Sequence, residues 1–239
     1  MPNVASRSLS EIQNEVVSCH RCTRLVRWRE QVAREKVRRY QDWEYWGKPN
    51  PSFGDPRAQV LLVGLAPAAH GGNRTGRMFT GDRSGDWLYR GLHKFGFANQ
   101  PTSVSRNDGL KLRNCYITAT CRCAPPQNKL LPSEILHCRP FLLQELEQLK
   151  RVRVVVGLGK VGFNSVVKCF VELGWSAFKK MPEFGHGVEY PLTERIILLG
   201  SFHPSQQNTF TGRLTEPMFD AVFKRALEIT QTNRSGLRN

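Results

Sequence analysis

The sequence predicts an α/β fold: a three-layer α/β/α sandwich with a central four-stranded, mainly parallel sheet. Four short apolar runs, rich in β-branched residues, are continuous rather than alternating, which is typical of parallel strands buried on both faces. Helical patterns separate them, and strand–helix alternation implies right-handed βαβ crossovers. The expected strands lie at 58–66, 114–120, 152–159 and 195–202.

The remaining segments are assigned in chain order. The first helix is expected over 8–32, with an interruption near its two cysteines, and an aromatic, Pro/Gly-rich stretch at 37–56 predicts a packed loop. The 239 residues suit one domain, 1–239, whose polar tail from about 232 is expected to be disordered. The other helices are expected at 84–95, 132–149, 160–173 and 215–231.

Unusual polar, Gly and Pro residues gather in the loops that follow the strands. In open α/β sheets, ligands bind outside the carboxyl ends of the strands, so these loops predict one functional edge. They are 65–83, 120–131, 157–160 and 203–214.

The charge points to a polyanionic partner. Lys plus Arg number 35 and Asp plus Glu 20, a net charge of +15, and cations placed on phosphates release condensed counterions. A basic surface that binds nothing is the alternative. No apolar run is long enough to span a bilayer, and the N-terminus has no hydrophobic signal region. The charge therefore predicts a DNA- or RNA-binding protein. We also expect it to be cytoplasmic, monomeric and independent of membranes.

Two residues of the first functional loop are candidates for chemistry. Phe79 is apolar in a polar loop and is suited to stack on a flat base, although it equally suits the core. Asp82 suits either orientation of water and stabilisation of a cationic transition state, or capping of the next helix. Ser84 or Asp86 can cap that helix instead, which would leave Asp82 free to face the cleft.

The last functional loop begins with His203, which directly follows a strand and precedes Pro204. A polar run from Ser205 to Thr209 and Arg213 follow, and such groups can hold phosphates while the loop tip enters a groove. A lone His is more often structural, so the surrounding polar run carries this assignment.

Seven cysteines, an odd number, argue against a disulfide framework and favour a metal or cluster site. Cys19 and Cys22 form a CxxC pair, which places two thiolates within reach of one metal. Spacing alone does not choose the second pair among the distal cysteines. Cys115 and Cys169 suit buried small hydrophobes.

Three motifs, in order, resemble the uracil-DNA glycosylase superfamily: GLAPAAHG at 64–71, CAPPQNKLLPSEILHCRP at 123–140 and HPSQQN at 203–208. The resemblance runs from about Cys19 to about Phe219. Ordinary uracil-specific members place an acid or Asn in the first motif, whereas this chain has Leu65, Ala66, Ala68 and Ala69. Together with NRTGRMFTGD, that pattern is similar to family 5 (type b), the branch that carries an iron–sulfur cluster.

The resemblance implies a role for each matching residue. Asp82 is the catalytic carboxylate, Phe79 stacks on the flipped base, Asn128 bonds the base and His203 bonds its oxygen. Cys19, Cys22, Cys123 and Cys138 ligate a structural 4Fe-4S cluster. Ala66, His70 and Ser205 are assigned to the substrate, and Asn208 and Arg213 to DNA.

The expected activity is that of a monofunctional DNA glycosylase, which hydrolytically excises uracil and other deaminated bases, such as hypoxanthine and xanthine, in base excision repair. Family 4 keeps an Asn where this chain has Ala119. A strictly uracil-specific family 4-like enzyme is one alternative. A non-catalytic nucleic-acid-binding module with a structural four-cysteine zinc site is another. A member that traps its product covalently is a third, but the expected His-containing insertion is absent.

Overall fold

The computed structural model describes residues 7–235 and contains a six-stranded mixed sheet with strand order β1-β3-β2-β4-β6-β5. Its four central strands are parallel, as predicted: β3 (Cys115–Ala119), β2 (Val60–Gly64), β4 (Val154–Leu158) and β6 (Ile197–Ser201). The expectation of only four strands was wrong. Two short antiparallel edge strands, β1 (Phe53–Gly54) and β5 (Glu189–Pro191), are too brief to give a periodic signal.

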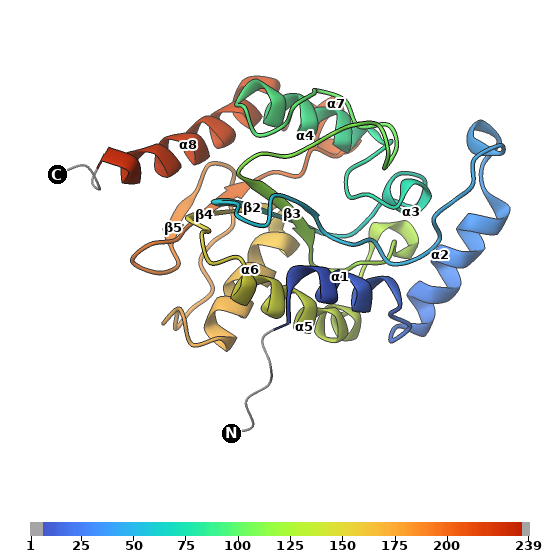
Figure 1. Ribbon diagram of the computed structural model, residues 1–239, viewed down its shortest axis with the longest axis horizontal. Helices are drawn as coiled ribbons and strands as arrows, with labels where there is room; N and C mark the ends of the chain where they lie inside the picture. The colour runs from blue at the N-terminus through green and yellow to red at the C-terminus, as the bar shows by residue number, and fades with distance from the viewer. Residues whose placement is uncertain (1–6, 236–239) are drawn as a thin grey trace.

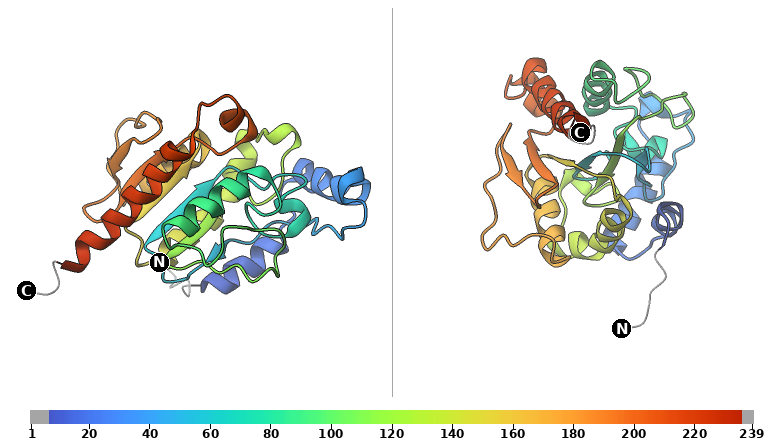
Figure 2. Two further views of the ribbon diagram at one scale, coloured as in Figure 1. Left: turned by 90° about the horizontal axis from the view of Figure 1, so that it is seen from above. Right: turned by 60° about the vertical axis from the view of Figure 1, so that its left-hand side comes forward.

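Helices cover both faces of the sheet, which makes the predicted three layers (Figures 1 and 2). Helices α4 (Arg83–Lys94) and α8 (Glu216–Ser235) lie on one face, and α5 (Pro132–Gln148) and α6 (Lys160–Glu172) on the other. Along β2, Val60 and Leu62 pack into the α4/α8 core, while Leu61 and Val63 pack into the α5/α6 core. Burial of alternate residues on opposite faces explains why the strand is apolar throughout.

The N-terminal helix is interrupted at the cysteines, as predicted. Helix α1 (Leu9–Val17) begins with a capping box between Ser8 and Glu11, and α2 (Thr23–Glu35) starts directly after Cys22. A 3-10 turn, η1 (Arg38–Tyr40), follows. The four other predicted helices match α4, α5, α6 and α8 within a few residues.

The C-terminal helix corrects one expectation. Helix α8 continues to Ser235, so residues 232–235 are helical rather than disordered, and 236–239 lie outside the described residues, as do 1–6. In the described part of the chain, no helix is long and apolar enough to cross a bilayer.

The loops after β2, β3 and β6 all meet at the carboxyl edge of the sheet. They contain the short elements α3 (Gly72–Thr75), η2 (Pro126–Asn128) and α7 (Gln206–Phe210). Because β2, β3 and β6 are parallel to their neighbours, segments far apart in sequence lie close together at this edge.

Candidate active site and cysteine cavity

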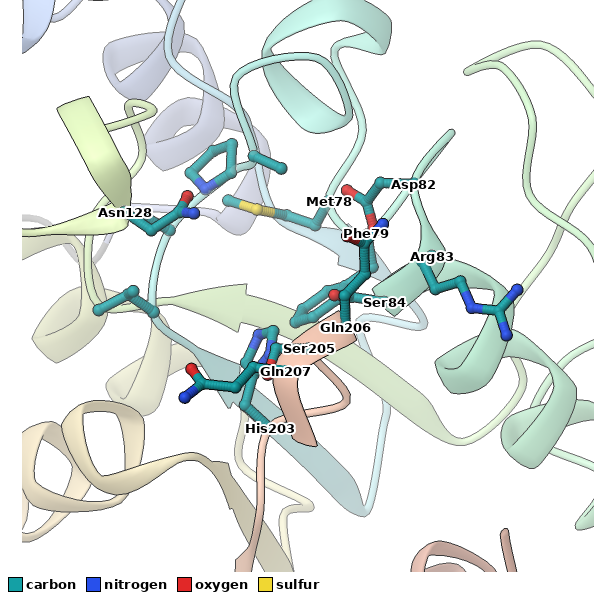
Figure 3. Close-up of a pocket in the computed structure, with 14 residues that line it drawn as sticks. Met78, Phe79, Asp82, Arg83, Ser84, Asn128, His203, Ser205, Gln206 and Gln207 are labelled. Atoms are coloured by element: carbon teal, nitrogen blue, oxygen red, sulfur yellow. The ribbon is translucent and has the colours of Figure 1, made fainter. Parts of the chain in front are cut away.

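A cavity of about 470 Å³ opens at the carboxyl edge of the sheet (Figure 3). Its volume lies in the roughly 300–1,000 Å³ range of small-molecule sites. Residues from the loops after β2, β3 and β6 line it: Leu65, Ala66, Pro67, Ala68, Met78, Phe79, Asp82, Arg83, Ser84, Asn128, His203, Ser205, Gln206 and Gln207. The predicted residues Ala66, Phe79, Asp82, Asn128, His203 and Ser205 are therefore brought together.

The rings of Phe79 and His203 lie against each other on one side of this pocket. Their centroids are 5.7 Å apart and their planes are 30° from parallel. A base between them would need about 7 Å, twice a contact distance of 3.5–4.0 Å, so the pair leaves no such gap. Asn128 lies across the open part of the cavity from both rings (Figure 3). A flat ligand therefore enters beside the ring pair, towards Asn128.

Phe79 is held in an unusual backbone conformation. Its φ of +52° is left-handed, which is costly for a bulky residue, and such strain concentrates at functional sites. A Cβ on Gly64 would lie 2.9 Å from the Phe79 ring, and a Cβ on Gly85 would lie 1.9 Å from the Phe79 carbonyl oxygen. Both glycines thus leave the space that this conformation requires.

Asp82 both lines the pocket and caps α4. Its Oδ1 accepts a hydrogen bond from the Gly85 amide at 3.0 Å, so of the alternatives that the sequence left open, Asp82 itself caps the helix rather than Ser84 or Asp86. The helix begins at Arg83, which puts Asp82 at the capping position itself. Burial raises the pKa of Asp82 above its usual value, while the Gly85 and Ser84 amides and the Arg74 charge act in the opposite direction. Asp82 supplies the single carboxylate among the described lining residues.

His203 is neutral at physiological pH because burial lowers its pKa to about 4. Its backbone carbonyl accepts hydrogen bonds from the Ser205 amide and from Nδ2 of Asn208, both at 2.8 Å. Ser205 also caps α7, accepting a bond from the Asn208 amide. Both residues thus hold the turn that carries His203. A neutral imidazole keeps one N–H group, which can donate a hydrogen bond to a carbonyl oxygen.

Three residues assigned from the sequence do not line the pocket. His70 Nδ1 lies 3.0 Å from the Tyr45 hydroxyl, on a separate contact. Asn208 faces the His203 carbonyl, and Arg213 is exposed with its guanidinium 4.7 Å from the Phe202 ring centroid. Arg213 thus remains accessible to a phosphate, whereas the Asn208 side chain stabilises the turn at His203.

Sequence reasoning missed the pocket residues Met78 and Arg83, and it assigned Gln206 and Gln207 to phosphates rather than to the pocket that they line. Met78 carries a usable signal, since it forms an apolar pair with Phe79 inside a polar loop. Arg83 carries none, because the first residue of a helix usually faces solvent.

A second cavity is lined by cysteines. Cys19, Cys22, Cys123 and Cys138 all face it, as does Cys121, and all the cysteines are free thiols. Buried Arg29 donates from Nη1 to the Cys123 sulfur at 3.1 Å. Among the described residues, no three His, Cys, Asp or Glu side chains gather closely enough to hold one metal ion.

The cysteine cavity nevertheless has the donor chemistry of a cluster site. Burial raises the pKa of Cys22 to about 11 and that of Cys123 to about 12, with neighbouring thiols adding to the effect. These raised pKa values favour neutral thiols while no cation is bound, whereas the Arg29 guanidinium favours a thiolate at Cys123. Several cysteines converging on one cavity are the donor set that a cluster requires. Cys115 and Cys169 lie elsewhere and are fully buried, as expected of small hydrophobes.

Comparison with known proteins identifies the family. Residues 51–227 match the uracil DNA glycosylase superfamily. The chain is 47% identical over 223 residues to a type-5 uracil-DNA glycosylase of Mycobacterium tuberculosis, covering 93% of this chain and 82% of the relative. It is 46% identical to a type-5 uracil-DNA glycosylase of Thermus thermophilus, covering 88% and 93%.

A type-4 uracil-DNA glycosylase of Sulfurisphaera tokodaii is more distant, at 25% identity over 83% of this chain and 74% of the relative. The higher identity to type-5 proteins agrees with the apolar first motif and argues against the family 4-like alternative. The chain therefore belongs to the uracil-DNA glycosylase superfamily, in its type-5 branch, and is a DNA glycosylase.

Proposed function

We propose that this DNA glycosylase hydrolytically excises uracil and the deaminated purines hypoxanthine and xanthine from DNA, leaving an abasic site in base excision repair. Uracil is the base in the names of its relatives. The observation that carries the wider range is the wall formed by Leu65, Ala66, Pro67 and Ala68. An apolar wall restricts a flat base by shape alone, so it tolerates both pyrimidines and purines.

Base recognition begins outside the duplex. A base must be flipped out at a cost of a few kcal/mol, and stacking and hydrogen bonds in the pocket offset that cost. Phe79 supplies the stacking surface, and Asn128 supplies an amide that both donates and accepts. The amide can reorient, so it can bond the different edges of uracil and hypoxanthine.

Bond cleavage needs charge stabilisation at two ends. As the N-glycosidic bond breaks, positive charge grows on the sugar and negative charge on the departing base. In its ionised form the Asp82 carboxylate stabilises the sugar cation and orients the water that adds to C1′, while neutral His203 donates a hydrogen bond to the base oxygen. The water gives its hydroxyl to the sugar, and the base leaves with a proton.

The pocket favours hydrolysis over strand cleavage. The described residues that line it include no lysine, so no amine is placed to form a Schiff base with the sugar. We therefore expect a monofunctional enzyme whose product is an intact strand with an abasic site.

We also propose that Cys19, Cys22, Cys123 and Cys138 hold a 4Fe-4S cluster. Each iron of such a cluster takes one thiolate, so the four sulfurs need not converge on a single ion. The thiols come from the turn between α1 and α2, the loop after β3, and α5. When bound, the group supplies a cross-link between these segments, with Arg29 bonding a ligand sulfur. Cys121 is not in this set because its thiol donates to the Glu134 carbonyl.

A panel of duplexes, each with one lesion, tests the substrate range. Uracil, hypoxanthine and xanthine strands are incubated with excess enzyme, cleaved with alkali and resolved on a gel. We expect excision of uracil and of at least one purine. The Asn128→Ala variant should lower the excision of these bases by unequal factors. Excision of uracil alone at saturating enzyme would refute the wider range.

A further inference from the structure

A separate cavity of about 450 Å³ lies between the segment after η1, helix α3 and the 105–107 loop. It shares no lining residue with the active-site pocket. Helix α2 and the segment that follows it project from the body of the protein beside α3 (Figure 1). No role in the proposed reaction accounts for this cavity.

Aromatic rings and cations alternate around it. The Arg74 guanidinium lies 3.8 Å from the Tyr40 ring centroid and 4.1 Å from that of Trp43. Arg106 lies 4.3 Å from the Trp46 centroid, and Lys48 lies near the same ring. Trp43 remains 38% exposed, so its ring is accessible to a ligand.

Arg74 shows that the cavity is built rather than incidental. The residue is 3% exposed, and it donates from Nε to the His70 carbonyl at 2.8 Å and from Nη2 to the Gly81 carbonyl at 2.9 Å. Its Nη1 is buried and has no hydrogen-bond partner within the described residues. An unpaired buried donor is costly, and a bound acceptor would relieve that cost.

The wall formed by the 105–107 loop is held firmly. Arg77 is buried and donates from Nη2 to both carboxylate oxygens of Asp108, at 2.8 and 2.7 Å. The same guanidinium bonds Ser103, on the other side of the loop. Arg106 is therefore presented from an ordered loop while its own side chain stays exposed.

The chemistry of the cavity selects its ligand. Lys48, Arg74 and Arg106 outnumber the single lining carboxylate, Glu44, so cationic ligands are disfavoured. Indole faces beside cations suit a molecule that is both flat and anionic, and a nucleotide has this combination. We propose that this cavity binds a nucleotide of the lesion-bearing strand, flanking the flipped base.

Arg74 links the two sites. The carbonyl it bonds belongs to Gly81, the residue directly before Asp82, so one loop forms a wall of each cavity. The inference rests on the proposed function: a strand whose target base enters the active-site pocket would reach the indoles across this shared loop. The flanking nucleotide thus adds affinity without taking part in bond cleavage.

Uracil-containing oligonucleotides, extended stepwise on either the 5′ or the 3′ side of the lesion, test the proposal. Dissociation constants and saturating single-turnover rates are measured for wild type, Trp43→Ala and Arg106→Ala. Trp175→Ala is the matched control for the indole, since Trp175 is 39% exposed. Arg151→Ala controls for charge, because exposed Arg151 precedes β4 at the opposite edge of the sheet.

Wild-type affinity should rise in a step once one flank reaches the cavity. Trp43→Ala and Arg106→Ala should remove that step, weakening long substrates about tenfold, while short substrates and saturating rates stay unchanged. The controls should keep the step. Two results overturn the proposal. One is an equal loss of affinity for oligonucleotides of every length, and the other is no loss of affinity in an Arg106→Ala variant of wild-type thermal stability. Excision of uracil from the shortest substrate reports separately on the proposed function.

Discussion

Gly71 lies directly against the carboxylate of Asp82: a Cβ at position 71 would be 2.0 Å from Oδ2. The glycine of the AHG motif thus leaves the room that the carboxylate occupies. The other oxygen, Oδ1, is bonded to the Gly85 amide, so Asp82 is held at the start of α4 and leaves no room for a side chain at position 71. Catalytic groups held this closely lose rate when they shift by even 1 Å.

Gly71→Ala should therefore lower the excision rate by displacing Asp82. We expect a loss of about 10²-fold in the single-turnover rate, with DNA affinity unchanged. Thermal unfolding of the same variant separates this effect from misfolding. A variant with both normal stability and normal rate would show that the contact with Gly71 does not position Asp82.

His203 makes stability depend on pH. Its pKa is about 4 in the folded protein and 6.5 in the unfolded chain, so the unfolded state takes up a proton first as pH falls. Stability from this residue is present above pH 6.5 and is lost between 6.5 and 4, at up to about 1.4 kcal/mol per pH unit.

Denaturant unfolding of wild type and His203→Asn between pH 7 and pH 4.5 measures this contribution. Wild type should lose stability more steeply, although His70 and His186, whose pKa values burial also lowers, contribute to both proteins. Parallel curves would show that folding does not lower the pKa of His203, contrary to the burial that keeps it a neutral donor.

The cysteine cavity predicts the metal content. Protein purified without oxygen should contain about four irons, and Cys19→Ser or Cys138→Ser should lose iron and soluble yield together. Cys169→Ser is the control, because Cys169 is buried away from the cavity. Stoichiometric zinc without iron would instead support a structural zinc site, since Zn²⁺ is bound by four thiolates without colour.

Arg213 predicts part of the salt dependence. Binding of undamaged duplex should weaken steeply with salt, and Arg213→Ala should reduce the slope by about one unit if this exposed guanidinium holds a phosphate. The neutral variant Gln207→Ala, at the neighbouring helix α7, should leave the slope unchanged. An unchanged slope in Arg213→Ala would remove it from the DNA interface.

The central strands and the pocket residues were predictable because their signals are local. Continuous apolar runs such as 60–64 require burial on both faces, and His203 lies just after such a strand. Phe79 and Asp82 lie further along the loop after β2, and the resemblance to a family motif chose between their alternative roles. The edge strands β1 and β5 were not predictable, since two or three residues carry no period. A single domain, a monomer and a cytoplasmic location stay predictions.

Other features depended on tertiary contacts. His70 was assigned to the substrate, but it pairs with Tyr45, a partner 25 residues earlier that no local pattern reveals. Asp82 was treated as either cap or catalyst, and one carboxylate serves the cap while it lines the pocket. The cavity lined by Trp43, Trp46 and Arg74 was missed because its rings and cations come from three separate segments.

Asp82→Asn tests the mechanism most directly, through the single-turnover rate of uracil excision at saturating enzyme. Asn keeps the shape and caps a helix about as well as Asp, so the fold and lesion-DNA binding should be preserved. Loss of the charge should lower the rate by 10²–10³-fold, or about 2.7–4 kcal/mol of transition-state stabilisation. A variant that excises uracil at the wild-type rate would show that Asp82 is a helix cap and nothing more.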